Sequence, residues 1–448
     1  MGLPGPRAGS RAPGPTTLVL VKVLVIGGGA REHALCRSLS LDPDVTALHC
    51  APGNAGTAEV AESHPVDILD GAAVADLAES LGVDFVIVGP EGPLVAGVAD
   101  AVRARGIDCF GPSTEAAALE GSKAFAKDVM AAAGVPTGRS YVCTTEDEVD
   151  TALDAFGAPY VVKDDGLAAG KGVVVTGDLA TARAHALACV AGASGGGRVV
   201  IEEFLDGPEV SLFAVTDGVT VVPLQPAQDF KRALDADEGP NTGGMGAYSP
   251  LPWADPNLVA EVERTVLQPT VDELRRRGTP FAGLLYAGLA ITSRGVRVIE
   301  FNARFGDPET QVVLARLKTP PAGLLRAAAT GQLAAFPELR WSDGAAVTVV
   351  LASFNYPDTP RTGDPITGLA DVAEKDAHAY VLHAGTRLEP DGRVVSAGGR
   401  VLSITATGPT LPKARERAYR ALDRIALDGA HHRTDIAASA STPPTHTA

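Results

Sequence analysis

Short runs of apolar, mostly β-branched residues recur along this chain, and several of them end in a glycine-rich turn. Such runs are typical of buried strands. In the first part of the chain they are Val21–Ile26, Phe85–Val88 and Ile107–Phe110. Residues 71–81 and 94–105 have the spacing of amphipathic helices instead. Strands that alternate with helices predict an open parallel α/β sheet over residues 21–122, and such sheets bind ligands beyond the carboxyl ends of their strands.

Two later apolar runs, Tyr160–Val162 and Val173–Thr176, bracket a loop that contains Gly166, Gly170 and Lys171. Glycine N–H groups approach an anion closely and a lysine neutralises it, so the loop is compatible with polyphosphate binding as well as with an ordinary hairpin. It is not a P-loop, because only three residues separate Gly166 from Gly170 and a strand follows where a P-loop has a helix. The pattern predicts two strands joined by a glycine-rich turn.

The remaining pattern predicts a mixture of helices, hairpins and one further strand. We expect helices at 123–133, 180–191, 258–277 and 411–425, a buried strand at 199–205, and hairpins at 209–224 and 284–301. The fold class is therefore α/β and α+β with several domains. The predicted divisions are a structureless start at 1–20, the α/β domain at 21–122, a central domain at 123–332 with a mobile part at about 139–205, a β-rich domain at 333–436, and a structureless tail at 437–448. We further expect translation to start at Val21 rather than Met1.

Composition excludes several classes of protein. The net charge of −16 over 448 residues argues against a nucleic-acid or anionic-membrane partner, since both need a basic face. No apolar run has the length of a membrane span, and no cleavage site follows the Leu18–Ile26 run. The five cysteines have no zinc or CxxC spacing, which suits a reducing cytoplasm. The nine histidines likewise form no metal-ligand pattern; the adjacent pair His431-His432 is expected to be solvated.

One carboxylate and one amide are candidates for a metal site. Glu300 and Asn302 lie two apart in a predicted strand and therefore project from the same face. Their oxygens suit Mg²⁺, which binds oxygen ligands from the protein and from substrate phosphates together. Mn²⁺ accepts the same oxygen set. The alternative is a solvated strand face, which the neighbouring Ile299 and Phe301 disfavour.

Two other segments carry polar groups beside apolar or glycine-rich ones. Glu202 and Glu203 lie near the end of the predicted strand at 199–205. An acid there can accept hydrogen bonds from an adenine amine or from ribose hydroxyls. The alternative is an ordinary surface acid. Charged residues at 228–232 precede a glycine loop at 239–246, which fits either a substrate clamp or a flexible linker.

Taken in order, these segments resemble an ATP-grasp enzyme, and further motifs narrow the resemblance. They are Gly-x-Gly-x-Arg-Glu-His-Ala at 27–34, Ala-Pro-Gly-Asn-Ala-Gly-Thr at 51–57, Gly-Pro-Glu-x-Pro-Leu at 89–94, Glu-Gly-Ser-Lys-Ala-Phe at 120–125, Asp-Gly-Leu-Ala-Ala-Gly-Lys-Gly-Val at 165–173, Gly-Pro-Asn-Thr-Gly-Gly-Met-Gly-Ala-Tyr-Ser-Pro at 239–250, Phe-Gly-Asp-Pro-Glu-Thr-Gln at 305–311, His-Ala-Gly-Thr at 383–386 and Gly-Gly-Arg-Val-Leu at 398–402. Together they look like the phosphoribosylamine–glycine ligase family, over about residues 21–436.

The resemblance implies a reaction and a set of site residues. The family joins glycine to 5-phosphoribosylamine with ATP, through a glycyl-phosphate intermediate, in purine synthesis. By resemblance, ATP would contact Lys123, Lys163, Gly166, Gly170, Lys171, Glu202, Glu203, Phe204, Leu205 and Glu209. The substrates would contact Gly27, Gly29, Arg31, Glu32, Gly89, Pro90, Glu91, Lys231, Gly243, Gly244 and Asp307. Catalytic groups would be Lys163, Asp229 and Arg304, and Mg²⁺ or Mn²⁺ would bind Glu300 and Asn302. We expect a cytoplasmic enzyme that is a monomer or a weak dimer.

Three positions depart from the family pattern. Asp164 stands where a small residue is usual, Phe230 where histidine is common, and Gly28 where asparagine is common. Strand alternation points Asp164 away from Lys163, so we expect only a small effect on phosphate binding.

Other classes fit the sequence less well. ATP-grasp carboxylases and formate-using ligases share the lysine hairpin and the acid-x-Asn strand but lack the 239–250 and 383–386 motifs. A Rossmann dehydrogenase needs an acid near the end of the second strand, and residues 49–52 supply none. A non-catalytic nucleotide sensor would be expected to have lost Lys163 or Glu300, and the chain retains both.

Overall fold

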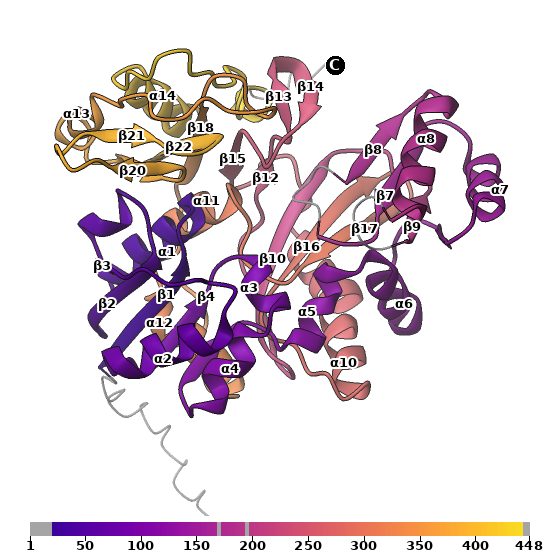
Figure 1. Ribbon diagram of the computed structural model, residues 1–448, viewed down its shortest axis with the longest axis horizontal. Helices are drawn as coiled ribbons and strands as arrows, with labels where there is room; N and C mark the ends of the chain where they lie inside the picture. The colour runs from indigo at the N-terminus through magenta and orange to yellow at the C-terminus, as the bar shows by residue number, and fades with distance from the viewer. Residues whose placement is uncertain (1–19, 168–171, 193–196, 442–448) are drawn as a thin grey trace, which may run out of the picture.

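The computed structural model describes residues 20–167, 172–192 and 197–441. Its N-terminal part is a parallel sheet in the order β3-β2-β1-β4-β5, flanked by helices (Figure 1). The strands are β1 (Val21–Gly27), β2 (Val45–Pro52), β3 (Glu62–Ser63), β4 (Phe85–Val88) and β5 (Asp108–Phe110). The helices are α1 (Ala30–Ser40), α2 (Gly71–Leu81), α3 (Glu91–Val95), α4 (Val98–Ala104) and α5 (Thr114–Gly121). This confirms the predicted open α/β sheet.

One helix of this region is broken where the sequence pattern predicted continuity. The predicted helix at 94–105 consists of α3 and α4, separated at Gly97, whose φ of 88° lies in the left-handed region. A Cβ atom at Gly97 would lie 3.0 Å from Oγ1 of Thr114. Apolar spacing continues across the break because both helices pack on the same core, so periodicity alone did not reveal it.

The glycine-rich turn at 165–172 joins two paired strands. β7 (Tyr160–Asp164) runs antiparallel to β8 (Val173–Thr176), with Lys163 opposite Val173, which confirms the predicted hairpin. They belong to a sheet in the order β6-β9-β7-β8. Its other elements are β6 (Ser140–Cys143), β9 (Val199–Glu202), α7 (Glu146–Phe156) and α8 (Leu179–Val190), and α6 (Lys123–Ala133) precedes them. In Figure 1 this small sheet projects on the side away from the N-terminal sheet.

The predicted strand at 199–205 is shorter than expected. β9 ends at Glu202, and Phe204 has 48% of its surface exposed. The apolar character of residues 204–205 therefore belongs to an open segment after the strand and not to the buried core.

A second, antiparallel sheet in the order β11-β10-β16-β17 passes through the centre of the molecule (Figure 1). Its strands are β10 (Glu209–Asp217), β11 (Val221–Pro223), β16 (Ala282–Thr292) and β17 (Gly295–Asn302), which confirms both predicted hairpins. The predicted helix at 258–277 is α9 (Leu258–Val262) and α10 (Gln268–Arg276), joined by a π-helical turn at 263–267. Two further helices follow the sheet, α11 (Glu309–Arg316) and α12 (Pro321–Ala329).

The C-terminal sheet contains strands from two distant parts of the chain. Its order is β12-β15-β18-β22-β19, so strands at 228–249 pair with strands after residue 344. They are β12 (Gln228–Asp229), β15 (Gly246–Ser249), β18 (Ala345–Ala352), β19 (Ala379–His383) and β22 (Arg400–Gly408). Smaller elements are β13 (Arg232–Leu234), β14 (Glu238–Asn241), β20 (Thr386–Leu388), β21 (Val394–Ser396), α13 (Leu369–Lys375) and α14 (Leu411–Leu422). The sheet thus crosses the predicted division at 332/333, which stays a prediction.

The chain end differs from the sequence-based expectation in one respect. Residues 438–441 form a short helix, α15 (Ala438–Ser441), and Ile436 is fully buried, so the tail predicted to be structureless from 437 starts with an ordered turn. The remaining residues of both predicted tails lie outside the described ranges. Within those ranges, no helix is long and apolar enough to cross a membrane.

Two buried histidines connect the N-terminal helix α1 to the C-terminal sheet. The backbone N–H of His383 donates to Nδ1 of His33 at 2.8 Å, and Nδ1 of His383 lies 3.0 Å from Oγ1 of Thr386. Burial lowers the pKa of His33 to about 3 and that of His383 to about 4. Both rings are therefore neutral in the folded protein at any pH near neutrality.

We expect these histidines to make the protein less stable as the pH falls below about 6.5, the pKa of an unfolded histidine. Because the folded pKa values are lower, the unfolded chain binds more protons, and stability falls with pH until the folded values near 3–4 are reached. At pH 5 the loss is up to about 2 kcal/mol for each histidine. Urea unfolding between pH 8 and pH 5 measures it. His33→Asn keeps an acceptor for the His383 N–H and should flatten the profile, whereas substitution of the exposed His378 should not; equal slopes would refute the assignment.

Candidate active site

A buried glutamate lies between two lysines at the base of the β7–β8 hairpin. Nζ of Lys163 is 2.6 Å from Oε1 of Glu202, and Nζ of Lys127 is 2.6 Å from Oε2. Burial alone would raise the pKa of Glu202, but the two lysines outweigh it and hold that pKa below its ordinary value. Lys127 was not among the predicted residues. Its partner Glu202 lies 75 residues later in the chain, and nothing in the sequence around Lys127 indicates that contact.

This pairing changes the interpretation of the 202–205 segment. Both carboxylate oxygens of Glu202 bind lysines, so Glu202 positions Lys163. Glu203 pairs with Arg139 at 3.0 Å and Arg294 at 2.9 Å. The parts of the segment open to a nucleotide are Phe204 and the partly buried Leu205. Contact of these four residues with ATP stays a prediction.

A β-bulge in β17 brings a backbone carbonyl to the same lysine. Gly288 pairs with Glu300 but its neighbour Leu289 pairs with Val298, so Ile299 has no opposite residue. An unpaired residue of this kind re-aims the backbone beside it. Nζ of Lys163 donates to the carbonyl of Ile299 at 3.1 Å. The lysine is thereby fixed next to the strand that carries Glu300.

Lys123 and Asp165 attach the hairpin to α6. Nζ of Lys123 donates to the carbonyl of Gly166 at 2.9 Å. The Asp165 carboxylate accepts from the backbone N–H of Ala124 at 3.1 Å and from the hydroxyl of Ser122. Lys123 therefore reaches the start of the glycine turn, as a phosphate-binding role requires. The predicted residues Gly170 and Lys171 lie outside the described ranges.

Asp164 is turned away from the lysines. Its side chain is buried, and Oδ1 has no hydrogen-bond partner among the described residues. It lies near Cys189 of α8: burial raises the pKa of that thiol to about 11, and Asp164 adds to the rise. This supports the expectation from strand alternation that the carboxylate does not pair with Lys163.

The proposed metal ligands lie among four cationic groups. Glu300 and Asn302 are both partly buried on β17. Burial would raise the pKa of Glu300, but Lys231, Lys163, Lys123 and Arg304 outweigh it, and the pKa lies below its ordinary value. An ionised carboxylate beside an amide oxygen is a donor set that fits Mg²⁺ or Mn²⁺.

On the other side of Glu300, two strands bring charged residues together. Nζ of Lys231 binds Oε2 of Glu209 at 2.5 Å. Glu209, expected to hold ribose, is thus paired with a residue expected to hold substrate. Burial raises the pKa of Asp229 to about 7; Lys231 opposes the rise, and Glu309 and Glu209 add to it. Asp229 is therefore the carboxyl group here that can exchange a proton near neutral pH.

The sequence analysis did not identify a buried network below these charges. Oε1 of Glu309 accepts from the hydroxyl of Tyr286 at 2.5 Å and from that of Ser211 at 3.0 Å. A Cβ atom at Gly306 would lie 2.5 Å from Oε2 of the same glutamate, so that position has room only for glycine. Glu309 lies in the 305–311 motif, but its partners come from β10 and β16 and were invisible in the sequence.

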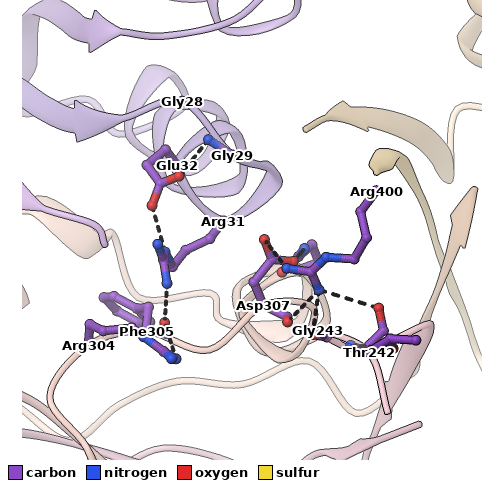
Figure 2. Close-up of polar contacts among 12 residues, drawn as sticks. Gly28, Gly29, Arg31, Glu32, Thr242, Gly243, Arg304, Phe305, Asp307 and Arg400 are labelled. Atoms are coloured by element: carbon purple, nitrogen blue, oxygen red, sulfur yellow. Dashed lines mark hydrogen bonds and ion pairs between the residues drawn. The ribbon is translucent and has the colours of Figure 1, made fainter. Parts of the chain in front are cut away.

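The first glycine turn accommodates Glu32. The Glu32 carboxylate accepts from the N–H of Gly29 at 2.7 Å and from Nε of Arg31 at 2.6 Å (Figure 2). A Cβ atom at Gly27 would lie 2.5 Å from Cγ of Glu32, and one at Gly89 would lie 2.1 Å from its Oε1. These two glycines are thus required by the packing of Glu32. The protein's own carboxylate thus uses part of the α1 N-terminus, where the resemblance implies substrate contacts.

Arg304 connects residues that follow the N-terminal sheet to β17, the strand that carries Glu300 and Asn302. Its guanidinium binds Glu91 at 3.1 Å and Glu120 at 2.9 Å, and it donates to Oδ1 of Asn302 at 3.3 Å. Burial would lower the pKa of Arg304, but Glu120 and Glu91 outweigh it and keep the group charged. NH1 of Arg31 donates to the carbonyl of Phe305 at 3.0 Å, and Arg304 donates to the same carbonyl (Figure 2).

Arg400 of β22 is a further site residue that the sequence analysis missed. It donates to the carbonyls of Gly243 at 2.6 Å and Asp307 at 2.8 Å, and its NH2 lies 3.3 Å from Oδ2 of Asp307 (Figure 2). It therefore joins two predicted substrate loops. The motif at 398–402 contains it, and a cation directly after two glycines was the available signal.

These contacts form one continuous polar region. It runs from Lys123 and Lys163 through Glu300 to Arg304, and from there to the α1 N-terminus and Arg400. It contains the predicted residues Lys123, Lys163, Glu300, Asn302, Arg304, Arg31 and Glu32, and the Glu202 carboxylate binds Lys163. Such a region can bind a polyphosphate with its metal at one end and a second anionic substrate at the other.

Comparison with known proteins agrees with this geometry. Residues 21–120, 121–310 and 346–439 match the N domain, the ATP-grasp (A) domain and the C domain of phosphoribosylglycinamide synthetase. The chain is 80% identical over 422 residues to the phosphoribosylamine--glycine ligase of Streptomyces coelicolor, covering 94% of this chain and 100% of that protein. It is 58% identical to the protein of that name in Mycobacterium bovis, over 93% and 97% of the two chains.

Solved structures show the same relationship. The crystal structure of phosphoribosylamine--glycine ligase from Thermotoga maritima has a TM-score of 0.80 at 32% identity and covers 93% of this chain and 100% of its own. The biotin carboxylase domain of the Hydrogenobacter thermophilus 2-oxoglutarate carboxylase has a TM-score of 0.71 at 16% identity, covers 92% of both chains, and shares the fold alone. Three domain matches that together span most of the chain, and relatives of 58–80% identity over nearly its whole length, show that this chain belongs to the phosphoribosylglycinamide synthetase family.

Proposed function

We propose that this chain catalyses the ATP-dependent ligation of glycine to 5-phosphoribosylamine, giving glycinamide ribonucleotide, ADP and phosphate in purine biosynthesis. The observation that carries the proposal is that Glu300 interacts with four cationic groups, Lys163 of the hairpin, Lys123 of α6, Lys231 and Arg304. The names of the relatives supply the substrates. We further propose that the enzyme works in the cytoplasm as a monomer or a weak dimer.

The reaction proceeds in two steps. A carboxylate oxygen of glycine attacks the γ-phosphorus of ATP, the bond from that phosphorus to the β,γ-bridging oxygen breaks, and ADP leaves. The amine nitrogen of phosphoribosylamine then attacks the acyl carbon of glycyl phosphate, phosphate leaves, and the nitrogen loses a proton. The first step is needed because an oxide is a poor leaving group and phosphate is a good one. The enzyme has to neutralise charge on the phosphoryl group and hold the reactants in line.

The residues of the site divide this work. Lys163, held between Glu202 and the Ile299 carbonyl, and Lys123 of α6, whose Nζ reaches the Gly166 carbonyl, neutralise the phosphates. The glycine turn, whose residues 168–171 lie outside the described ranges, is expected to shield the acyl phosphate from hydrolysis by water. A divalent ion held by Glu300 and Asn302 would supply further neutralisation of the phosphate oxygens. Arg304, Arg31 and Arg400 lie where the loops at 243–244 and 305–307 meet α1, and they position the phosphoribosylamine.

The test of the proposal is ADP release by the purified protein, with glycine, phosphoribosylamine, ATP and Mg²⁺ each omitted in turn. Release must require both glycine and phosphoribosylamine. Bicarbonate and biotin, substrates suggested by the carboxylase fold, replace glycine and phosphoribosylamine in a control reaction. This reaction should give no ADP release. ADP release that needs bicarbonate, or that does not need phosphoribosylamine, would refute the proposal.

Asp229 is expected to accept the proton that the attacking amine loses. Asp229→Asn should lower kcat about 10²-fold, since a positioned base typically contributes 10²–10⁴-fold. In the unaltered enzyme the rate should fall below pH 7, because protonation removes the base, and the pKa of Asp229 is raised to about 7. The kcat–pH profile of both proteins measures this. If the rate of Asp229→Asn still falls below pH 7, the group whose protonation lowers the rate is not Asp229.

A further inference from the structure

The edge of the N-terminal sheet assembles three potential metal ligands that no sequence motif indicated. His49 of β2 is the Cα partner of Glu62 of β3, and His64 follows Glu62 by two positions. Residues two apart in an extended strand lie on the same face, so both side chains of the β3 edge point toward His49. The ligand atoms of the three residues all lie within 4.8 Å of one another. This group is separate from Glu300 and from every other residue of the active site described above.

The distances within the group are close to those of a zinc site. Nδ1 of His49 lies 3.0 Å from Nε2 of His64, and the two nitrogens lie 3.6 Å and 3.8 Å from the Glu62 oxygens. Two nitrogens that bind tetrahedral Zn²⁺ at about 2.0–2.1 Å are about 3.3–3.4 Å apart. Shifts of a few tenths of an ångström therefore place an ion between the three side chains.

Burial and charge favour a metal that imidazole binds well. The side chains of His49 and His64 are 11% and 16% exposed, whereas Glu62 is 69% exposed. Metals bind imidazole in its neutral form, and a carboxylate beside two imidazoles supplies the negative charge. Imidazole ligands select Zn²⁺ over Mg²⁺, which prefers oxygen. The site would therefore not compete for the ion at Glu300.

We propose that His49 Nδ1, His64 Nε2 and the Glu62 carboxylate bind one Zn²⁺-type ion, with water completing the coordination. The ion lies at the end of the loop that links β2 to β3. In this loop the Asn54 amide donates to the carbonyls of Gly28 at 2.9 Å and His383 at 2.8 Å. The loop thus touches both the glycine turn before α1 and the C-terminal sheet. A bound ion holds the loop against β2 and stabilises the contact between these two parts of the protein.

The experiment titrates the full-length protein, first treated with EDTA, with Zn²⁺ in competition with a chromophoric chelator and in millimolar Mg²⁺. One Zn²⁺ per chain is expected. Glu62→Gln and His64→Gln should each weaken binding about 10-fold or more, since loss even of groups that only orient the ligands costs 10–100-fold. Glu59→Gln is the matched control, because Glu59 is an exposed glutamate three residues earlier in the same loop. Co²⁺ should give visible absorption bands in the wild-type protein and in Glu59→Gln, but not in His64→Gln.

Three results would overturn the proposal. They are the absence of saturable Zn²⁺ binding, equal affinity in Glu62→Gln and Glu59→Gln, and loss of binding in His432→Gln with the other variants unaffected. Each would leave His49 and His64 as a hydrogen-bonded pair. Because Glu62 is mostly exposed, Glu62→Gln tests the site without a risk to folding. The proposed effect on the loop has its own readout: Zn²⁺ should raise the Tm of the wild-type protein and not that of Glu62→Gln.

Discussion

Glu300→Gln is expected to lower kcat about 10³-fold, since charge stabilisation by a metal in the transition state is worth several kcal/mol. The substitution keeps the size of the side chain and removes the charge that binds Mg²⁺. Lys231, Lys163, Lys123 and Arg304 then face the phosphates without that carboxylate, so ATP binding should persist while turnover is lost. Rates of ADP release and the Kd for ATP, each measured over a range of Mg²⁺ concentrations, separate the two effects.

The metal dependence gives a sharper readout than the rate. In the unaltered enzyme ATP binding should tighten with Mg²⁺, and in Glu300→Gln this dependence should weaken. Glu261→Gln, at an exposed position of α9, is a suitable control for removing a glutamate charge from the same domain. Full activity of Glu300→Gln at ordinary Mg²⁺ concentration would remove the basis for placing the metal at Glu300 and Asn302.

Lys163→Met is expected to lower kcat/KM for ATP about 10³-fold, the upper range for removal of one group that stabilises transition-state charge. Lys127→Met is its matched control, because both lysines lie 2.6 Å from the same glutamate. Either substitution leaves Glu202 with one cationic partner. Breaking a buried ion pair costs about 3–5 kcal/mol, so both variants should be destabilised to a similar extent.

The two variants should therefore differ in activity and not in stability. Only Lys163 also contacts the strand that carries Glu300, through the Ile299 carbonyl. Urea unfolding and steady-state rates on the same preparations test this. If Lys127→Met loses as much activity per folded molecule as Lys163→Met, the phosphate-binding role belongs to the ion-pair cluster as a whole and not to Lys163.

The site shows which contacts short sequence patterns can predict and which they cannot. Glu300 and Asn302 were found because strand geometry alone places residues two apart on one face. The hairpin at 160–176 was found because glycines between β-branched runs have few other structural solutions. Glu202 was not recognised as the partner of two lysines, for the opposite reason. Its position at the end of a buried strand was clear, but its partner Lys127 lies on a helix 75 residues earlier, and no local pattern connects the two.

The glycines illustrate a second limit. At Gly27 and Gly89 the resemblance implied substrate contacts, and the structure places the side chain of Glu32 against both. A glycine in a sequence says that space is needed close to the backbone, and not what fills it. Arg400 was missed similarly, since its three acceptors come from two loops 93 and 157 residues away.

The sequence by itself predicted most of the strands and helices, the open parallel sheet, the glycine hairpin, the shared strand face of Glu300 and Asn302 and, through its motifs, the family. These features depend on spacing within a few residues, where backbone geometry dictates which side chains share a face. The tertiary structure alone decided which lysines Glu202 neutralises, that strands at 228–249 complete the C-terminal sheet, and that His49 meets Glu62 and His64. Those contacts join residues from separate elements, and their formation depends on how the whole chain packs.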